Sequence, residues 1–159
     1  MKALRYAFIL LCLSFMANTA SAQLMLGGGV AYGTDVEEIA IQVRGVYSFN
    51  ETWRGQADVT YYLDGVEDVS FYEINLNGNY VFSDTGTALF YALAGLSIGV
   101  ANVDLGPFGS ASGSDTGINL GAGGNFALGG GGTMLFGEAK YTLGGFEQLV
   151  LAAGVLFSL

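Results

Sequence analysis

Large apolar residues alternate with polar or small ones along most of this chain. Between residues 72 and 82 the sequence reads YEINLNGNYVF, in which aromatic and aliphatic residues alternate with glutamate and asparagine. Successive side chains of a β-strand point to opposite faces, so this segment has one apolar face and one polar face. The same period of two recurs in residues 38–48, 53–63, 118–128 and 135–143. This pattern predicts β-strands whose two faces meet different surroundings.

Three further segments, 24–33, 87–102 and 148–159, complete a set of eight predicted strands. Their lengths, about 9 to 14 residues, exceed the ~5 to 6 typical of soluble strands and fit tilted strands that cross a bilayer, which need ~9 to 11. The apolar face of segment 87–102 stays open, because two sets of residues compete for it. One set is Leu89, Tyr91 and Leu93, and the other is Phe90, Leu96, Ile98 and Val100.

The connections between these strands differ in length. Short runs of turn-forming residues at 50–52, 83–86 and 129–132 alternate with the connections 34–37, 64–68, 103–115 and 144–147, of which 103–115 is the longest. An even number of strands, with short turns at one end and longer loops at the other, is typical of membrane barrels. The expected fold is therefore all-β: an eight-stranded antiparallel up-and-down transmembrane β-barrel.

Composition indicates which strand face is buried. Only 12% of the residues are charged, against about 25% in typical soluble domains. If the apolar faces pointed inward, Ile, Val, Leu and aromatic side chains from every strand would overfill the narrow interior of an eight-stranded barrel. We therefore expect them to face lipid. Aromatic residues near the ends of the apolar faces predict an interfacial girdle: Tyr47, Trp53, Tyr61, Tyr72, Tyr80, Tyr141 and Phe157.

The polar faces carry charges of both signs into the expected interior. Charges shielded from bulk water need partners, and the inward-facing set supplies three basic and three acidic side chains. We predict that they form an ion-pair and hydrogen-bond network with the asparagines of residues 72–82 around it. The alternative is a polar lumen filled with water. The predicted network residues are Arg44, Arg54, Asp58, Glu73, Glu138 and Lys140.

The first 22 residues differ from the rest of the chain. Lys2 and Arg5 precede an almost wholly apolar run, and Ala20-Ser21-Ala22 follows it, which is the pattern of a cleaved secretory signal peptide. Residues 23–159 then form one outer-membrane barrel domain without cysteine. Loss of Lys2 and Arg5 leaves three basic residues against fourteen acidic ones, a net charge of −11. This balance excludes nucleic-acid binding, which needs clustered Lys and Arg.

The mature chain resembles the small eight-stranded outer-membrane barrels of the OmpA/OmpX type. The most specific part of the resemblance is FGEAKYTLGGFEQLVLAAGVLFSL, at residues 136–159. There a strand with glutamate, a small residue, lysine and tyrosine precedes a short glycine-containing loop and a final strand with an Ala-Gly-Val core. The family usually ends on an aromatic residue, whereas this chain ends on Leu159 with Phe157 two positions earlier. The resemblance implies a family whose functional roles vary.

Enzymatic and cofactor chemistry find little support. The chain has no histidine, the commonest general base, and the small barrels that resemble this size class and act as enzymes use one. The glycine-rich stretch at 121–125 lacks the following helix that a dinucleotide site requires. We expect no cofactor and no catalytic residue. The external loops carry the carboxylates Asp35, Glu37, Asp64, Glu67, Asp68, Asp104 and Asp115, which predict a solvated acidic rim, with bound divalent cations as the alternative.

These features predict a monomeric, non-enzymatic protein of the cell outer membrane with a structural or surface-interaction role in the envelope. Its expected partners are membrane lipids and the outer-membrane assembly machinery. Two alternatives stay open. One is a small outer-membrane channel or transporter for small or apolar solutes, against which a lumen packed by Tyr62, Phe71, Met134, Phe136 and the charged pairs argues. The other is a soluble secreted barrel that binds an apolar ligand.

Overall fold

The computed structural model describes residues 24–63, 69–104, 106–129 and 132–159. The predicted signal peptide lies outside the described residues, as do Asp64, Glu67 and Asp68 of the second external loop. Within the described ranges, no helix is both long enough and apolar enough to cross a membrane.

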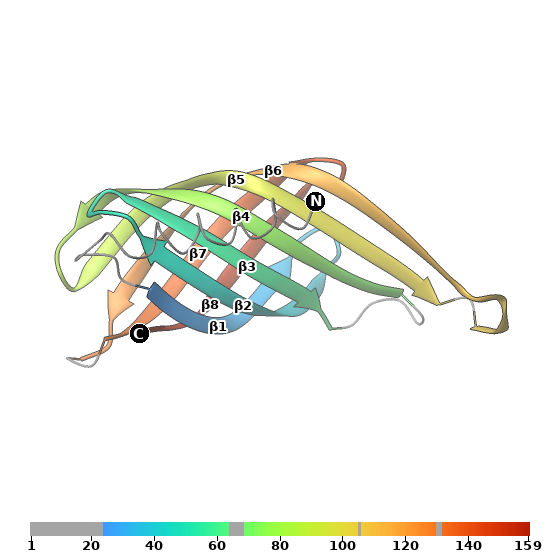
Figure 1. The fold of residues 1–159 in the computed structure, drawn as a ribbon, viewed down its shortest axis with the longest axis horizontal. Helices are drawn as coiled ribbons and strands as arrows, with labels where there is room; N and C mark the ends of the chain where they lie inside the picture. The colour runs from blue at the N-terminus through green and yellow to red at the C-terminus, as the bar shows by residue number, and fades with distance from the viewer. Residues whose placement is uncertain (1–23, 64–68, 105, 130–131) are drawn as a thin grey trace, which may run out of the picture.

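The described chain forms one closed barrel of eight strands (Figure 1). Each strand pairs antiparallel with the next, and β1 also pairs with β8, which closes the sheet. The predicted fold class, an eight-stranded antiparallel up-and-down barrel, is therefore confirmed. The strands are β1 (Leu24–Gly33), β2 (Glu38–Ser48), β3 (Trp53–Tyr62), β4 (Val69–Asp84), β5 (Ala88–Asp104), β6 (Ser110–Ala127), β7 (Thr133–Gly144) and β8 (Gln148–Ser158).

The two ends of the barrel differ. At the terminal end, which carries both chain ends, Leu159 N donates to Leu24 O at 2.9–3.0 Å scale, 3.0 Å. The connection between β2 and β3 is also at this end, where Asn50 Oδ1 accepts from the N–H groups of Thr52 and Trp53 at 2.9 and 2.8 Å. The loop end carries the connections β1–β2, β5–β6 and β7–β8.

Three strands are longer than the sequence predicts. β4, β5 and β6 contain 16, 17 and 18 residues, and the expected long loop 103–115 is mostly strand. Pairing between β5 and β6 continues as far as Asp104↔Ser110, and only the short 3₁₀ helix Gly106–Phe108 breaks it. Serine, alanine and glycine in residues 110–117 give no apolar alternation, so their pairing with β5 is visible only in the fold. Figure 1 shows this hairpin reaching past the other strands.

Apolar side chains point outward and polar ones inward. On β4, Ile74 and Leu76 are 46% and 65% exposed, whereas Glu73 and Asn75 are 0% and 1% exposed. β2 repeats the arrangement, with exposed Ile41 and Val43 on either side of buried Gln42. A soluble barrel has the opposite polarity. The outward apolar band is the surface of a transmembrane barrel, so the predicted transmembrane class is confirmed.

The faces of β5 are also defined. Leu89, Tyr91 and Leu93 are buried inside, whereas Leu96 and Ile98 are exposed outside. Both competing sets therefore exist on one strand, because the inner face changes from large residues near the terminal end to Gly95, Ser97 and Gly99 near the loop end. The interior near β5 is packed, and the register irregularity lies instead in β4, between Val81 and Ser83.

Candidate functional site: the barrel lumen and its loop end

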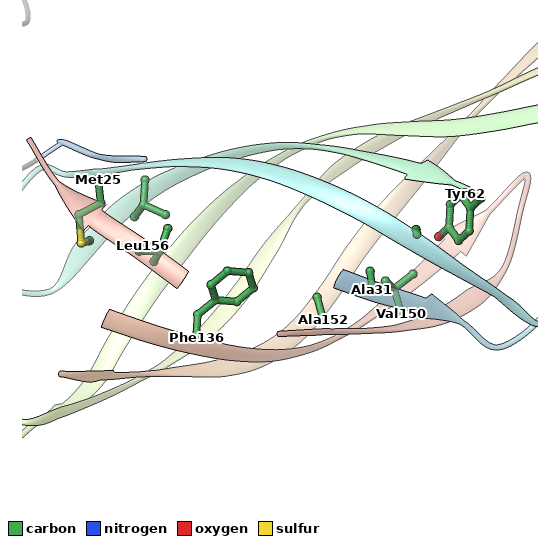
Figure 2. Packing of buried hydrophobic residues seen from close by; sticks show 9 residues of the cluster. Met25, Ala31, Tyr62, Phe136, Val150, Ala152 and Leu156 are labelled. Atoms are coloured by element: carbon green, nitrogen blue, oxygen red, sulfur yellow. The ribbon is translucent and has the colours of Figure 1, made fainter. Parts of the chain in front are cut away.

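The interior of the barrel is layered along its axis. Figure 2 shows buried apolar side chains toward both ends: Met25 and Leu156 lie together near the terminal end, and Tyr62 and Val150 lie toward the other end. A second apolar group, Val81, Leu89, Tyr91 and Leu93, lines the inside of β4 and β5. Most buried polar residues occupy the level between the apolar ends. The polar lumen expected from the sequence therefore has an apolar base.

The first polar cluster is built on Arg44 of β2 and Glu138 of β7. The guanidinium donates two bonds to the carboxylate, Nη1 to Oε2 at 2.9 Å and Nη2 to Oε1 at 2.7 Å. Tyr91 adds a hydrogen bond from its hydroxyl to Oε2 at 2.7 Å, and Gln56 Nε2 lies 3.3 Å from both oxygens. The Arg44 guanidinium carbon also lies 4.1 Å from the centre of the Phe136 ring. This geometry provides the partners that a buried ion pair needs.

The second polar cluster surrounds Glu73 of β4. Lys140 Nζ lies 3.4 Å from Glu73 Oε2, and both side chains are at most 2% exposed. Tyr62 donates its hydroxyl to Glu73 Oε1 at 2.9 Å. Gln148 Nε2 donates to the same carboxylate and to the Tyr62 hydroxyl oxygen. One lysine and two neutral donors therefore serve this carboxylate.

Asp58 of β3 joins the two clusters. Its carboxylate accepts from Gln42, Gln56 and Asn75 at 3.2, 3.0 and 2.8 Å. Gln42 Oε1 in turn accepts from Arg44 Nη2 at 2.9 Å, and Asn75 Nδ2 lies 3.5 Å from Glu73 Oε2. These bonds connect the buried charges into one continuous network across the lumen.

The six predicted network residues do not all meet. Arg44, Asp58, Glu73, Glu138 and Lys140 belong to the connected network, whereas Arg54 lies apart on β3 near the terminal end and is only partly buried. With the Asn125 amide turned so that its oxygen faces the guanidinium, Arg54 Nη1 donates to it at 3.2 Å. Sequence reasoning missed the neutral members, whose only signal is their position on the inward faces: Gln42, Gln56, Tyr62, Tyr91, Asn119 and Gln148.

Aromatic side chains close the loop end of the lumen. Phe146, from the β7–β8 connection, packs edge-to-face on Phe71 with ring centroids 5.9 Å apart, and Phe71 lies 5.2 Å from the Tyr62 ring. Gly99 makes this possible, because a Cβ at that position would come within 2.7 Å of the Phe146 ring. The polar network therefore lies between an aromatic cap and an apolar base.

The predicted girdle residues lie at two levels. Tyr47, Trp53, Tyr80 and Phe157 are near the terminal end, and Trp53 and Tyr80 pack with ring centroids 5.2 Å apart. The remaining residues, Tyr61, Tyr72 and Tyr141, lie toward the loop end, where Tyr61 and Tyr72 are paired in register. Trp53 and Tyr61 are eight positions apart on β3, which is roughly 26 Å along a strand and roughly 20 Å of height at the usual tilt.

Charges of opposite sign are separated between the inside and the outside of the barrel. The basic residues of the described ranges are Arg44, Arg54 and Lys140, and all three are on inward faces. Exposed carboxylates at the loop end include Asp35, Glu37, Asp115 and Glu147. The described part of the rim is therefore acidic. Within the described ranges no group of three or more metal-binding side chains is present, and the cation alternative stays a prediction.

No known family and no curated protein matches the chain. Three solved structures share its fold, each covering most of both chains. The N-terminal barrel domain of Pseudomonas aeruginosa OprF has a TM-score of 0.70 at 16% identity, covering 86% of this chain and 97% of that one. Neisserial surface protein A has 0.66 at 20%, covering 87% and 96%. Ail, the attachment invasion locus protein of Yersinia pestis, has 0.62 at 17%, covering 87% and 97%.

These likenesses confirm the expected resemblance to small eight-stranded outer-membrane barrels at the level of fold. Sequence identities of 16 to 20% carry no information on a shared ligand or partner.

Proposed function

We propose that this chain is a non-enzymatic outer-membrane barrel that stabilises itself with a sealed interior and contacts other molecules at its loop end. The observation that carries the proposal is the connected network around Arg44, Asp58 and Glu73, which occupies the lumen between two apolar levels. A channel needs a continuous aqueous path, and an enzyme needs reactive groups that a substrate can reach. A sealed lumen offers neither.

An outer-membrane location follows from the outer surface. Exposed aliphatic side chains form a band between two levels of aromatic residues, which suits lipid tails and head-group boundaries. The three solved structures of similar fold are outer-membrane or surface proteins by name. Membrane lipids, the assembly machinery and a monomeric state are part of this proposal.

Burial argues against catalysis by the interior carboxylates. Glu138 and Glu73 are 7% and 0% exposed, and each bonds a basic side chain. A general acid or base must reach the proton that it transfers, and these two groups are already engaged in structural bonds. The inward polarity also argues against a soluble barrel with an apolar ligand cavity.

The loop end is the surface left for recognition. One structure of the Yersinia protein Ail contains the heparin analogue sucrose octasulfate. Here the described rim exposes Asp35, Glu37, Asp115 and Glu147 and no basic side chain. A polyanion would meet like charge, so we propose that this rim contacts neutral or cationic partners.

Single-channel recording in planar bilayers tests the sealed lumen. Purified mature protein that has folded, as shown by faster gel migration before boiling than after, should insert without discrete conductance steps. The double variant Arg44→Ser/Glu138→Ser removes the largest paired side chains of the lumen and should conduct, which proves that the assay detects an opened barrel. Discrete steps from the folded wild-type protein would replace this proposal with the channel alternative.

A further inference from the structure

The geometry points to a docking edge: we propose that residues 110–116 of β6 bind an extended, basic segment of another protein by adding it as a strand. This inference rests on the proposed function, since it places the partner at the loop end. It goes further by naming the surface and the chemistry of the partner.

Strand pairing leaves this part of β6 open on one side. β6 pairs with β5 from Ala88↔Phe126 to Asp104↔Ser110, but its pairing with β7 begins only at Gly117↔Gly144. β5 is covered on its other side, since β4 pairs with it up to Val69↔Val103. Among the described residues, β6 is thus the outer strand of a three-stranded sheet that projects beyond the barrel (Figure 1).

Hydrogen bonding identifies the groups that face the open side. Thr116 O accepts from Gly145 N at 3.3 Å, so the backbone polar groups of Thr116 point toward the β7 side. N–H and C=O of one residue share a side in an antiparallel strand, and the side alternates from residue to residue. Ser110, Ser112 and Ser114 therefore present their N–H and C=O groups to the open edge. This row is a template for another strand.

The edge lacks the usual features that prevent such pairing. Natural edge strands are protected by lysine, proline, bulges or short length. Residues 110–116 read SASGSDT, with no lysine or proline, and they pair with β5 without a register shift. All seven positions are exposed. Their small side chains place no bulky group beside an incoming strand, so main-chain hydrogen bonds would supply most of the affinity.

Charge selects the partner. Asp115 lies within the edge strand and Glu147 in the neighbouring β7–β8 connection, and both are exposed. The basic residues of the described ranges all face the lumen, so no cation on the described surface compensates these carboxylates. A segment with lysine or arginine complements this edge, whereas an acidic one is repelled.

A second copy of the chain in the same membrane fits less well. Two barrels related by a two-fold axis along the membrane normal would cross their tilted strands at about 80°, twice the usual tilt of about 40°. Edges that cross at such an angle cannot share a ladder of hydrogen bonds. Both copies would also present Asp115 and Glu147 to each other.

The test uses the full mature barrel in nanodiscs and a fluorescent heptapeptide of alternating lysine and threonine. Ser112→Pro/Ser114→Pro removes two edge N–H groups at positions where proline is tolerated, because they face away from β5. The matched control, Ser112→Ala/Ser114→Ala, removes the hydroxyls and keeps the N–H groups. We expect the wild type and the alanine control to bind alike, and the proline variant to bind about tenfold more weakly.

The charge requirement has its own variant. Asp115→Asn/Glu147→Gln should weaken binding of the lysine peptide, and a glutamate–threonine peptide should bind more weakly than the lysine peptide to the wild type. Equal binding to the proline variant and the wild type would overturn the docking edge, as would no binding to a correctly folded barrel. Sedimentation that shows self-association, lost in the proline variant, would assign the edge to a second copy and overturn the basic partner.

The outcomes also separate this inference from the function on which it rests. A folded barrel that does not conduct and binds no peptide overturns the docking edge alone. A barrel that conducts overturns the proposed function, whatever the peptide does.

Discussion

The ion pair between Arg44 and Glu138 illustrates how a charge is tolerated inside so narrow a barrel. Removing an ion from water costs several kcal/mol even after relaxation, and a single partner rarely compensates for that loss. Here two parallel hydrogen bonds join the charges, and Tyr91 and Gln56 add donors to the carboxylate. The stability of each residue therefore depends on several strands at once.

The variant Glu138→Gln tests this dependence. It leaves Arg44, which is 1% exposed, without its anionic partner. Loss of one member of a buried pair typically costs about 3 kcal/mol or more, so the urea midpoint of the variant refolded into lipid vesicles should fall clearly below that of the wild type.

Glu147→Gln is the matched control, because Glu147 is an exposed carboxylate on the same side of the sequence. Exposed substitutions usually change stability by less than about 0.5 kcal/mol, so its midpoint should stay near the wild-type value. An unchanged midpoint in Glu138→Gln, and also in Glu73→Gln, would show that the network contributes nothing measurable to stability.

At the scale of the strand, glycines permit the closure between β1 and β8. A Cβ on Gly27 would collide with the backbone oxygen of Val155, and one on Gly29 with that of Ala153. On the facing strand, a Cβ on Gly154 would collide with the backbone oxygen of Gly28. The two strands approach too closely for inward side chains at these positions, so the glycines are needed for close approach.

We therefore expect Gly27→Ala and Gly29→Ala to destabilise the closed barrel by about 2 kcal/mol each, the usual cost of overpacking. Gly137→Ala is the control, because a Cβ there would meet nothing within 4 Å. The measurement is the temperature at which the fast-migrating folded form disappears on a gel. If all three variants melt together with the wild type, close approach at this seam does not limit closure.

At the scale of the whole molecule, polarity is inverted relative to a soluble barrel. Val43 and Leu76 are 70% and 65% exposed, whereas Arg44 and Asn75 are both 1% exposed. Such a surface is stable only where lipid or detergent covers it. The inversion also explains the low charge content, since the outer face of every strand is reserved for apolar residues.

Trp53 is the single tryptophan of the chain, and it is 51% exposed at the terminal end of the apolar band. In vesicles its fluorescence should be quenched by brominated lipids, and more strongly by bromines near the head group than by bromines at the end of the acyl chain. Trp53→Phe removes the signal and serves as the control. Absence of quenching in a folded sample would contradict the lipid-facing orientation.

Local pattern was sufficient for most of the strands and for the direction of their side chains. Residues such as Ile41, Gln42 and Val43 reveal their faces through alternation alone, because the period of a strand is fixed by covalent geometry. The same period places Arg44, Glu73 and Glu138 inside. By itself, then, the sequence determines a membrane barrel with charges in its lumen.

Only the tertiary structure decides which charges meet and where pairing stops. Arg44 and Glu138 are 94 positions apart in sequence, and strand stagger around the closed sheet sets their distance, so Arg54 on the same kind of face stays outside the network. The open edge of β6 is equally invisible in SASGSDT, because it results from the shorter reach of β7. Alternation is a local property of the backbone, whereas contacts across the lumen and the ends of pairing depend on how all eight strands are staggered.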